Sequence, residues 1–367
     1  MDRNRSPRPP GPAVRRRTYL IAALALAALA GAAVFAASHT NPNKVSAAAV
    51  DVNNLPVGPQ APAVEPKGWL NSPPLTPADL AGKVVIYDFW TYSCVNCVRT
   101  IPYVRSWYAR YQADGLVVIG IHSPEFDFEK NHANVARAVR GLGVTWPVAF
   151  DDDLHVWNAF QNQYWPAKYI ADRQGRVRYF HPGEGGYAET EDVIRALLGV
   201  PASAPRAAAP ADAAGAQQTT QQTTPETYLG TERGTAGAKP GPATYPDPGT
   251  PPPDTAALAG PWLASGQYVQ ASAAGAAVVL NFTAREVNLV MSPDTGPVDV
   301  FVELDGKPLP PAYRTAQTML DGQGRTFVAV TQADMYRLVL GPAVERHVLR
   351  LITEAPGVEA FAFTFGT

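Results

Sequence analysis

The sequence predicts an α/β domain followed by an all-β sandwich, with a transmembrane helix in front of both. An uncharged apolar run occupies residues 18–38 behind a cluster of arginines. Strand-like and helix-like patterns alternate between residues 84 and 199, whereas residues 277–366 alternate apolar and polar positions between turn signals. A length of 367 residues with 46% apolar content is enough to bury more than one core.

The N-terminal residues predict a membrane anchor. Six arginines lie among residues 1–17, and the run at 18–38 is about long enough to cross a bilayer as a helix. Because basic residues tend to stay in the cytoplasm, the chain after His39 is expected on the other side. Small residues near Ser38 also fit a cleaved signal peptide, and Arg16-Arg17 loosely resembles a twin-arginine export signal.

Composition divides the rest of the chain. Residues 39–66 are polar and Ala/Pro-bearing, and residues 201–258 contain low-complexity and Pro/Gly-rich stretches, so both are predicted to be linkers. Two folded domains then remain, at 67–200 and 259–367. The formal net charge of -2 gives no reason to expect a nucleic-acid partner.

The first folded unit begins with a strand, helix, strand pattern. Short β-branched and aromatic runs indicate buried strands, and apolar residues at helical spacing indicate helices. The expected elements are strands at 83–90 and 116–122 around a helix at 98–111, a helix at 126–141, a hairpin of strands 167–172 and 176–181, and a last helix at 189–199.

Both cysteines of the chain, Cys94 and Cys97, lie at the first strand-to-helix junction. A helix N-terminus stabilises a thiolate through its free N–H groups and its dipole, so Cys94 is predicted to be the nucleophile. Cys97, on the first helical turn, is placed to attack a mixed disulfide at Cys94. The pair therefore predicts thiol–disulfide exchange.

Other interpretations of the pair remain open. A structural disulfide would close a very short loop and stabilise little. A zinc site would need further ligands, and the histidines are scattered singly, so no metal site is predicted. Haem attachment is excluded because Val98, rather than histidine, follows Cys97. No cofactor is expected.

The stretch DFWTYSCVNC, from Asp88 to Cys97, resembles the strand and redox motif of the thioredoxin superfamily. The resemblance implies a thioredoxin-like fold, with Cys94 attacking and Cys97 resolving. It also places Asp88 on the buried acid that is thought to assist proton transfer in thioredoxins. Burial would raise the pKa of Asp88 and let it act as a base near neutral pH. The alternative is a solvated carboxylate at a strand end.

The superfamily also implies a cis-proline facing the disulfide. Pro166 is the candidate because the predicted hairpin follows it directly, and Pro147 is its rival. The interval from Cys97 to Pro166 is long enough to include an additional helix and strand. In this feature the sequence resembles the membrane-tethered, extracytoplasmic subgroup of the superfamily. Aromatic residues around these positions are predicted to line the substrate surface, or else to be ordinary core: Trp90, Tyr92 and Trp165.

Glu125 and His122 lie where the second predicted strand ends, the edge at which ligands meet such sheets. Glu125 is therefore a further substrate-binding candidate, although polarity of a loop explains both residues almost as well.

The second unit alternates apolar and polar residues in seven short runs, which predicts a β-sandwich with jelly-roll-like topology. Together with PETYLG, VELDG and FAFTFG, it resembles the C-terminal carbohydrate-binding-module-like domain of DipZ-type proteins. Its aromatic residues are candidates for stacking on sugars or for core packing: Trp262, Tyr268, Tyr313 and Tyr336. A module that recruits partners on a flexible linker is the favoured interpretation.

These patterns predict a membrane-anchored, extracytoplasmic thiol–disulfide oxidoreductase that acts on protein cysteines. Expected partners are cysteine-containing proteins, a separate membrane electron donor or acceptor, and glycan as a further candidate. The alternative is a cell-envelope protein that binds glycan or protein and carries a redox-inert thioredoxin scaffold.

Overall fold

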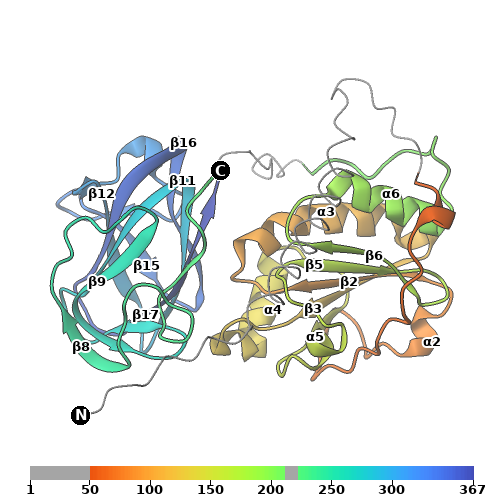
Figure 1. The fold of residues 1–367 in the computed structure, drawn as a ribbon, viewed down its shortest axis with the longest axis horizontal. Coiled ribbons are helices and arrows are strands. Elements are labelled where there is room, and N and C mark those ends of the chain that lie inside the picture. Colours follow the sequence, from red (N-terminus) through yellow and green to blue (C-terminus); the bar gives the residue numbers. More distant parts are fainter. Residues whose placement is uncertain (1–49, 211–221) are drawn as a thin grey trace, which may run out of the picture. The chain divides into compact units, whose positions relative to one another are not determined.

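A computed structural model describes residues 50–210 and 222–367 (Figure 1). The predicted cytoplasmic tail at 1–17 and the predicted anchor or signal at 18–38 lie outside the described residues. No helix within the described ranges is long and apolar enough to cross a membrane.

The α/β region is built on a six-stranded mixed sheet in the order β1-β4-β3-β2-β5-β6. Its centre is parallel, since β2 pairs with β3 and β3 with β4 in the same direction, whereas β1, β5 and β6 run antiparallel to their neighbours. The strands are β1 (Trp69–Leu70), β2 (Val84–Trp90), β3 (Leu116–His122), β4 (Val148–Phe150), β5 (Ala167–Ala171) and β6 (Val177–Pro182).

Helices cover both faces of this sheet. Apolar residues of α3, α4 and α6 pack on one face, and α5 packs on the other; Figure 1 shows α3 and α6 on the opposite side of the sheet from α5. The helices are α2 (Pro77–Leu80), α3 (Val95–Tyr111), α4 (His132–Gly141), α5 (His155–Ala159) and α6 (Tyr187–Leu198), with 3-10 turns η2 (Val52–Asn54), η3 (Gln112–Asp114) and η4 (Asp127–Lys130).

Strand β2 explains why a carboxylate ends up beneath the redox motif. All seven of its residues are buried, and successive side chains point to opposite faces. Val84, Ile86 and Trp90 pack with Cys97 on the α3 side. Val85, Tyr87 and Phe89 pack on the other side, with residues of α5. Asp88 shares the spacing of the first set, so it also lies on the side that α3 covers.

The predicted helix at 126–141 is interrupted. The structure has the 3-10 turn η4 and then α4, with a break at Asn131. The Asn131 side chain accepts a hydrogen bond from the backbone N–H of Ala133 at 3.0 Å, so Asn131 caps the second helix. The capping residue divides the expected helix in two.

The C-terminal region is β-rich, as predicted. Its strands form one hydrogen-bonded antiparallel network rather than two separate sheets, so a jelly-roll arrangement remains a prediction. The strands are β7 (Thr227–Tyr228), β8 (Gly241–Tyr245), β9 (Thr255–Ala264), β10 (Val269–Ala271), β11 (Ala277–Pro293), β12 (Val298–Leu304), β13 (Lys307–Pro308), β14 (Met319–Leu320), β15 (Thr326–Val330), β16 (Asp334–Thr353) and β17 (Val358–Gly366), with one 3-10 turn, η6 (Pro311–Tyr313).

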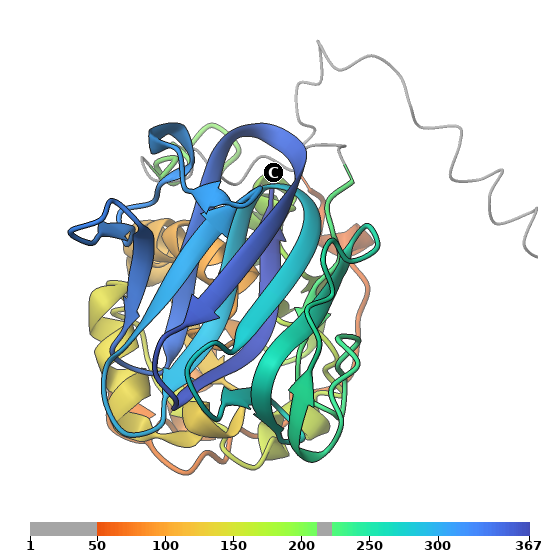
Figure 2. The same cartoon turned by 90° about the vertical axis from the view of Figure 1, so that its left-hand side faces the viewer.

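Two pairs of expected short strands are continuous in the structure. Strand β11 contains both runs expected between 277 and 292, and β16 contains both expected between 335 and 353. These two long strands lie side by side (Figure 2) and pair with register shifts near Ala284 and Val287. Polar residues that resemble a turn in the sequence are thus accommodated within a strand by local irregularities.

The predicted linkers are shorter than expected. Strands β7, β8 and the start of β9 lie within 201–258 and pair with the C-terminal sheet, so the latter part of that segment is not a linker. In the linker predicted at 39–66, the described residues from 50 onward also contact the α/β region: Arg178 donates to the carbonyl oxygens of Val52, Leu55 and Pro56.

The core of the C-terminal region takes up part of the aromatic set considered for sugar stacking. Trp262 and Tyr336 are 2% and 4% exposed and pack in the main apolar cluster. Burial removes these two residues from an accessible stacking face, whereas Tyr268 and Tyr313 are half-buried.

Candidate active site

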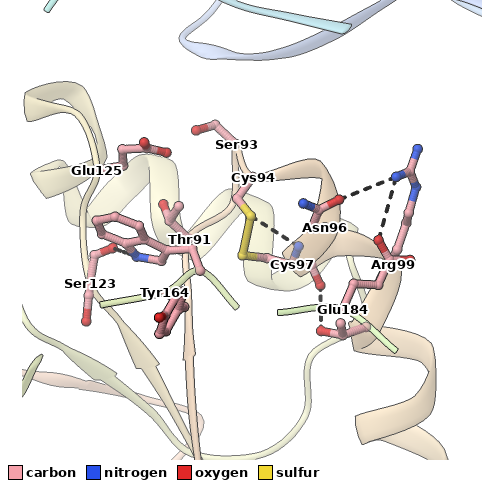
Figure 3. The surroundings of a disulfide bond; sticks show 12 residues. Thr91, Ser93, Cys94, Asn96, Cys97, Arg99, Ser123, Glu125, Tyr164 and Glu184 are labelled. Atoms are coloured by element: carbon pink, nitrogen blue, oxygen red, sulfur yellow. Dashed lines mark hydrogen bonds and ion pairs between the residues drawn. A yellow bond between two sulfur atoms is a disulfide. The ribbon is translucent and has the colours of Figure 1, made fainter. Parts of the chain in front are cut away.

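Cys94 and Cys97 form a disulfide at the start of α3, with their Cα atoms 5.2 Å apart (Figure 3). Cys94 is the N-cap residue of the helix, and its Sγ accepts a hydrogen bond from the backbone N–H of Cys97 at 3.2 Å. Cys94 is half-buried, whereas Cys97 is fully buried. The geometry makes Cys94 the more accessible sulfur, as expected for an attacking cysteine; its role stays a prediction.

The bond between Trp165 and Pro166 is the cis peptide bond of the described chain, so the choice of Pro166 over Pro147 is confirmed. The Trp165 indole donates to the carbonyl oxygen of Ser123 at 2.9 Å, and its ring lies 4.1 Å from that of Trp157. These contacts fix the residue in front of the cis-proline against the loop that follows β3.

Asp88 lies behind the disulfide helix as a buried carboxyl group with 1% exposure, which excludes a solvated strand end. Burial raises its pKa to about 6, although the nearby charge of Lys168 acts in the opposite direction. The group can therefore exchange a proton near neutral pH.

Lys168 is a site residue that the sequence analysis missed. It stands opposite Asp88 in the β2–β5 register, is fully buried, and places Nζ 3.9 Å from the Asp88 carboxylate. Neither Nζ nor the facing Oδ1 has a hydrogen-bond partner among the described residues. Burial lowers the pKa of Lys168. A lysine in the apolar run AKYIA was the available signal.

Glu129 is a second buried carboxyl group that the sequence analysis missed. Ser93, next to Cys94, donates its hydroxyl to Oε1 at 2.5 Å, and the backbone N–H groups of Glu125 and Phe126 donate to Oε2 at 2.6 and 3.0 Å. Burial raises the pKa of Glu129 to about 7. Glu129 thus ties the loop after β3 to the residue in front of Cys94.

Two of the predicted substrate-binding aromatics are buried in the folded protein. Trp90 and Tyr92 are each 2% exposed, and the Tyr92 ring stacks on His122 with centroids 5.8 Å apart. Burial lowers the pKa of His122 to about 3, so this side chain is neutral. Trp165, the third predicted aromatic residue, is only half-buried. Contact of any of the three with a substrate stays a prediction.

Glu125 contacts the C-terminal region. Its Oε1 accepts hydrogen bonds from the Tyr228 hydroxyl at 2.7 Å and from Arg233 at 2.9 Å. Figure 3 shows Glu125 among the residues that surround the disulfide. The predicted substrate-binding residue is therefore held in place by side chains from the other half of the protein.

The same loop is packed into an apolar cluster with the C-terminal strands. Phe126 is buried together with Val290, Phe361 and Ala362, and the backbone N–H of Asp127 donates to the Gln267 side chain at 2.9 Å. The sequence analysis expected a recruitment module on a free tether. In the structure the C-terminal region instead packs against the segment that carries Glu125 and Glu129.

Arg99 forms a second connection two residues after Cys97. Its guanidinium lies 3.7 Å from Glu184 and 2.9 Å from Glu286 of β11, and Glu286 is also 3.6 Å from Arg337. The side chains of Arg99, Glu184 and Glu286 are each 15% exposed or less. These four residues are far apart in the chain, so no sequence pattern predicted that they would form ion pairs.

Comparisons with known proteins agree with this architecture. Residues 57–180 match the AhpC/TSA family, and residues 224–366 match the family described as thioredoxin like C-terminal domain. The protein DipZ of Mycobacterium tuberculosis is 34% identical over 308 residues, which is 82% of this chain and 41% of DipZ. The chain thus spans less than half the length of that relative.

Smaller proteins match a little over a third of this chain. The thiol-disulfide oxidoreductase YkuV of Bacillus subtilis is 29% identical over 132 residues, 36% of this chain and 88% of YkuV. A solved structure of a putative thiol:disulfide interchange protein DsbE from Chlorobium tepidum is 24% identical and covers 39% of this chain and 99% of its own, with a TM-score of 0.34. The two matched regions of the chain are thus similar to thioredoxin-like proteins.

Proposed function

We propose that this protein is a thiol–disulfide oxidoreductase that exchanges disulfides with cysteine pairs of other proteins outside the cytoplasm, and that residues 18–38 hold it at the membrane. The observation that carries the chemistry is the disulfide at the start of α3, with accessible Cys94 and buried Cys97. A helix N-terminus favours the Cys94 thiolate, which is the form that attacks.

The reaction passes through a mixed disulfide. In the reducing direction, the Cys94 thiolate forms a bond to one sulfur of a substrate disulfide, and the other substrate sulfur leaves as a thiolate. The Cys97 thiolate then attacks Cys94 Sγ, and the substrate sulfur that was bonded to Cys94 leaves as a thiolate. Two electrons pass to the substrate, and the enzyme ends in the disulfide form. The reverse sequence oxidises a substrate dithiol.

Asp88 is proposed to accept the Cys97 proton before the second step and to return it in the reverse reaction. Its carboxyl group lies on the face of β2 that α3 covers, and its pKa of about 6 keeps it largely ionised at pH 7. Lys168, 3.9 Å away, is proposed to stabilise that ionised form.

A membrane-bound electron donor or acceptor is proposed as the second partner. Each exchange leaves the Cys94–Cys97 pair with two electrons gained or lost, so another protein has to restore it before the next turnover. In the proposed location beyond the membrane disulfides persist, so the restoring partner would have to reach the cysteine pair there.

One experiment on intact cells and one on purified protein test the proposal. After mild reduction, a membrane-impermeant maleimide is expected to label the full-length chain in intact cells, and Cys94→Ser with Cys97→Ser is the unlabelled control. Labelling only after lysis would contradict the location. Purified protein is expected to reduce a protein disulfide in the presence of dithiothreitol; no acceleration would favour the redox-inert binding protein.

A further inference from the structure

A pocket of about 170 Å³ lies where the loop after β3 meets the C-terminal region. Glu125 and Trp165 line it from the α/β side, and Tyr228, Glu232 and Arg233 line it from the C-terminal side. Its two halves come from separate regions of the chain.

The pocket borders the predicted reaction site. Trp165 directly precedes the cis-proline Pro166 and donates to the carbonyl oxygen of Ser123. Glu125 lies two residues after Ser123 in the same loop. Ser123 and Glu125 both lie in the surroundings of the disulfide (Figure 3). A polypeptide with its cysteine at Cys94 would therefore bring a neighbouring residue to the pocket.

The C-terminal wall of the pocket is fixed by close backbone contacts. The backbone N–H of Glu232 donates to the carbonyl oxygen of Gly266 at 2.9 Å. A Cβ atom on Gly230 would collide with the backbone of Gly266 and Gln267. The glycines let two loops approach closely, so the pocket has a defined wall before any substrate arrives.

The charge of the pocket is unbalanced. Arg233 pairs with Glu125 at 2.9 Å and lies 3.9 Å above the Tyr228 ring, and the neighbouring carboxyl group of Glu226 also interacts with Arg233. Glu232 is exposed, and its carboxylate has no hydrogen-bond or ion-pair partner among the described residues. Among the side chains that line the pocket, the carboxylates of Glu125 and Glu232 therefore exceed the one guanidinium by one negative charge.

We propose that this pocket is a substrate subsite that binds a lysine or arginine side chain near the reactive cysteine of a polypeptide. The basic group would lie beside Glu232, and its aliphatic stem would pack on the aromatic rings. The inference rests on the proposed function and adds a substrate preference to it. The C-terminal region thereby helps to select substrates rather than only recruiting them.

Peptides with an activated disulfide test the subsite. Each peptide has one cysteine bonded to thionitrobenzoate and carries Lys, Gln or Glu at one of the two positions on either side. The Cys94 thiolate attacks the peptide sulfur, and coloured thionitrobenzoate leaves because it is the better leaving group. At one position at least, the Lys peptide is expected to react about fivefold faster than the Glu peptide with full-length reduced protein.

Glu232→Gln is expected to remove most of that ratio, whereas the control Glu354→Gln is expected to preserve it. Glu354 is an exposed carboxylate that lines a different pocket of the same region. Equal ratios in both variants, or no Lys preference at any position, would overturn the subsite. Failure of every peptide to react would instead contradict the proposed thiol chemistry.

Arginine variants provide a test of opposite sign. Arg233→Gln removes the ion-pair partner of Glu125, which keeps its hydrogen bond from Tyr228, and is expected to increase the Lys-to-Glu rate ratio. Arg325→Gln is the matched control, because Arg325 has nearly the same side-chain exposure (43% against 44%) and also stacks on a ring, that of Phe301, at 4.0 Å. A ratio that falls or stays constant in Arg233→Gln would contradict the proposed charge balance.

Discussion

The two halves of the described chain differ in what they bury. The C-terminal region buries polar side chains, but its buried residues include no aspartate, glutamate, lysine, arginine or histidine within 222–367. Its charged pairs, such as Arg325 with Asp321, lie nearer the surface. The α/β region buries eight side chains of these five types: Asp88, His122, Glu129, Asp151, Lys168, Asp172, Glu191 and Arg195.

Burying an ionisable group costs free energy unless it is well paired, so its presence calls for a reason. Three of these groups lie close to the redox motif: Asp88 and Lys168 on neighbouring strands, and Glu129 bonded to Ser93. Perturbed ionisable groups gather at functional sites, and the contrast with the C-terminal region therefore indicates where the chemistry is done.

The largest effect is expected from the cysteines. Cys97→Ser should lose turnover by about a thousandfold or more and accumulate mixed disulfides through Cys94, because nothing remains to resolve them. Cys94→Ser should lose turnover without trapping a partner. Non-reducing gels of the two variants provide the measurement. Trapping by Cys94→Ser alone would reverse the two roles and undo the assignment based on exposure.

Asp88→Asn is expected to lower the exchange rate about a hundredfold at pH 7, because an amide cannot take the Cys97 proton. The wild-type rate should rise with pH as the carboxyl group deprotonates near pH 6, and the variant should lack that rise. Rapid-mixing fluorescence from pH 5 to pH 8 measures both.

Asp172→Asn is the control for Asp88→Asn. Asp172 is also buried in the α/β region, but it follows β5 at the turn toward β6 and pairs with Arg178 at 3.0 Å. Equal losses of rate in the two variants would show that burial of any carboxylate supports the fold, and the proposed proton transfer would be wrong.

Glu129→Gln should change stability more than chemistry. The folded-state pKa of Glu129, about 7, lies above its ordinary value of 4.5, so folding favours the protonated form. That contribution is complete below pH 4.5 and is lost as pH rises through 7, on the order of 3 kcal/mol. The variant, which stays neutral, should show a flatter profile of unfolding free energy between pH 5 and 8. Parallel profiles in urea titrations would contradict this.

Much of the fold was predictable because its signals are local. Strand β3 matches its predicted bounds, and β2 is one residue shorter at its start. The cis bond was expected from the resemblance to thioredoxins, and the hairpin that follows Pro166 indicated its position. The break at Asn131 also had a local signal, since asparagine is a preferred N-cap, but helical spacing on both sides concealed it.

The unpredicted part of the site depends on contacts between distant segments. Lys168 acquires its meaning only when β5 pairs with β2, and Glu125 only when Tyr228 reaches it from residues expected to be linker. Composition also misled at β8, where a Gly/Pro-rich run pairs with β9 at the sheet edge. Such positions follow from tertiary structure, not from periodicity.

The smallest effect is expected at a buried amide of the C-terminal region. Asn288 of β11 is fully buried, and neither polar atom of its side chain has a hydrogen-bond partner among the described residues. Replacing an unpartnered polar group by an apolar group of similar size removes a desolvation cost. Asn288→Leu should therefore raise the free energy of unfolding by about 1 kcal/mol and leave exchange activity unchanged.

Asn281, on the same strand, is the matched control for this change. Its side-chain amide donates to the carbonyl oxygen of Pro251 at 2.9 Å, so Asn281→Leu should lower the free energy of unfolding by about 1 kcal/mol. Urea titrations of the two variants measure the opposite signs. If Asn288→Leu instead destabilised the protein and slowed exchange, the C-terminal region would also depend on a buried polar group for the chemistry, and the contrast between the two halves would fail.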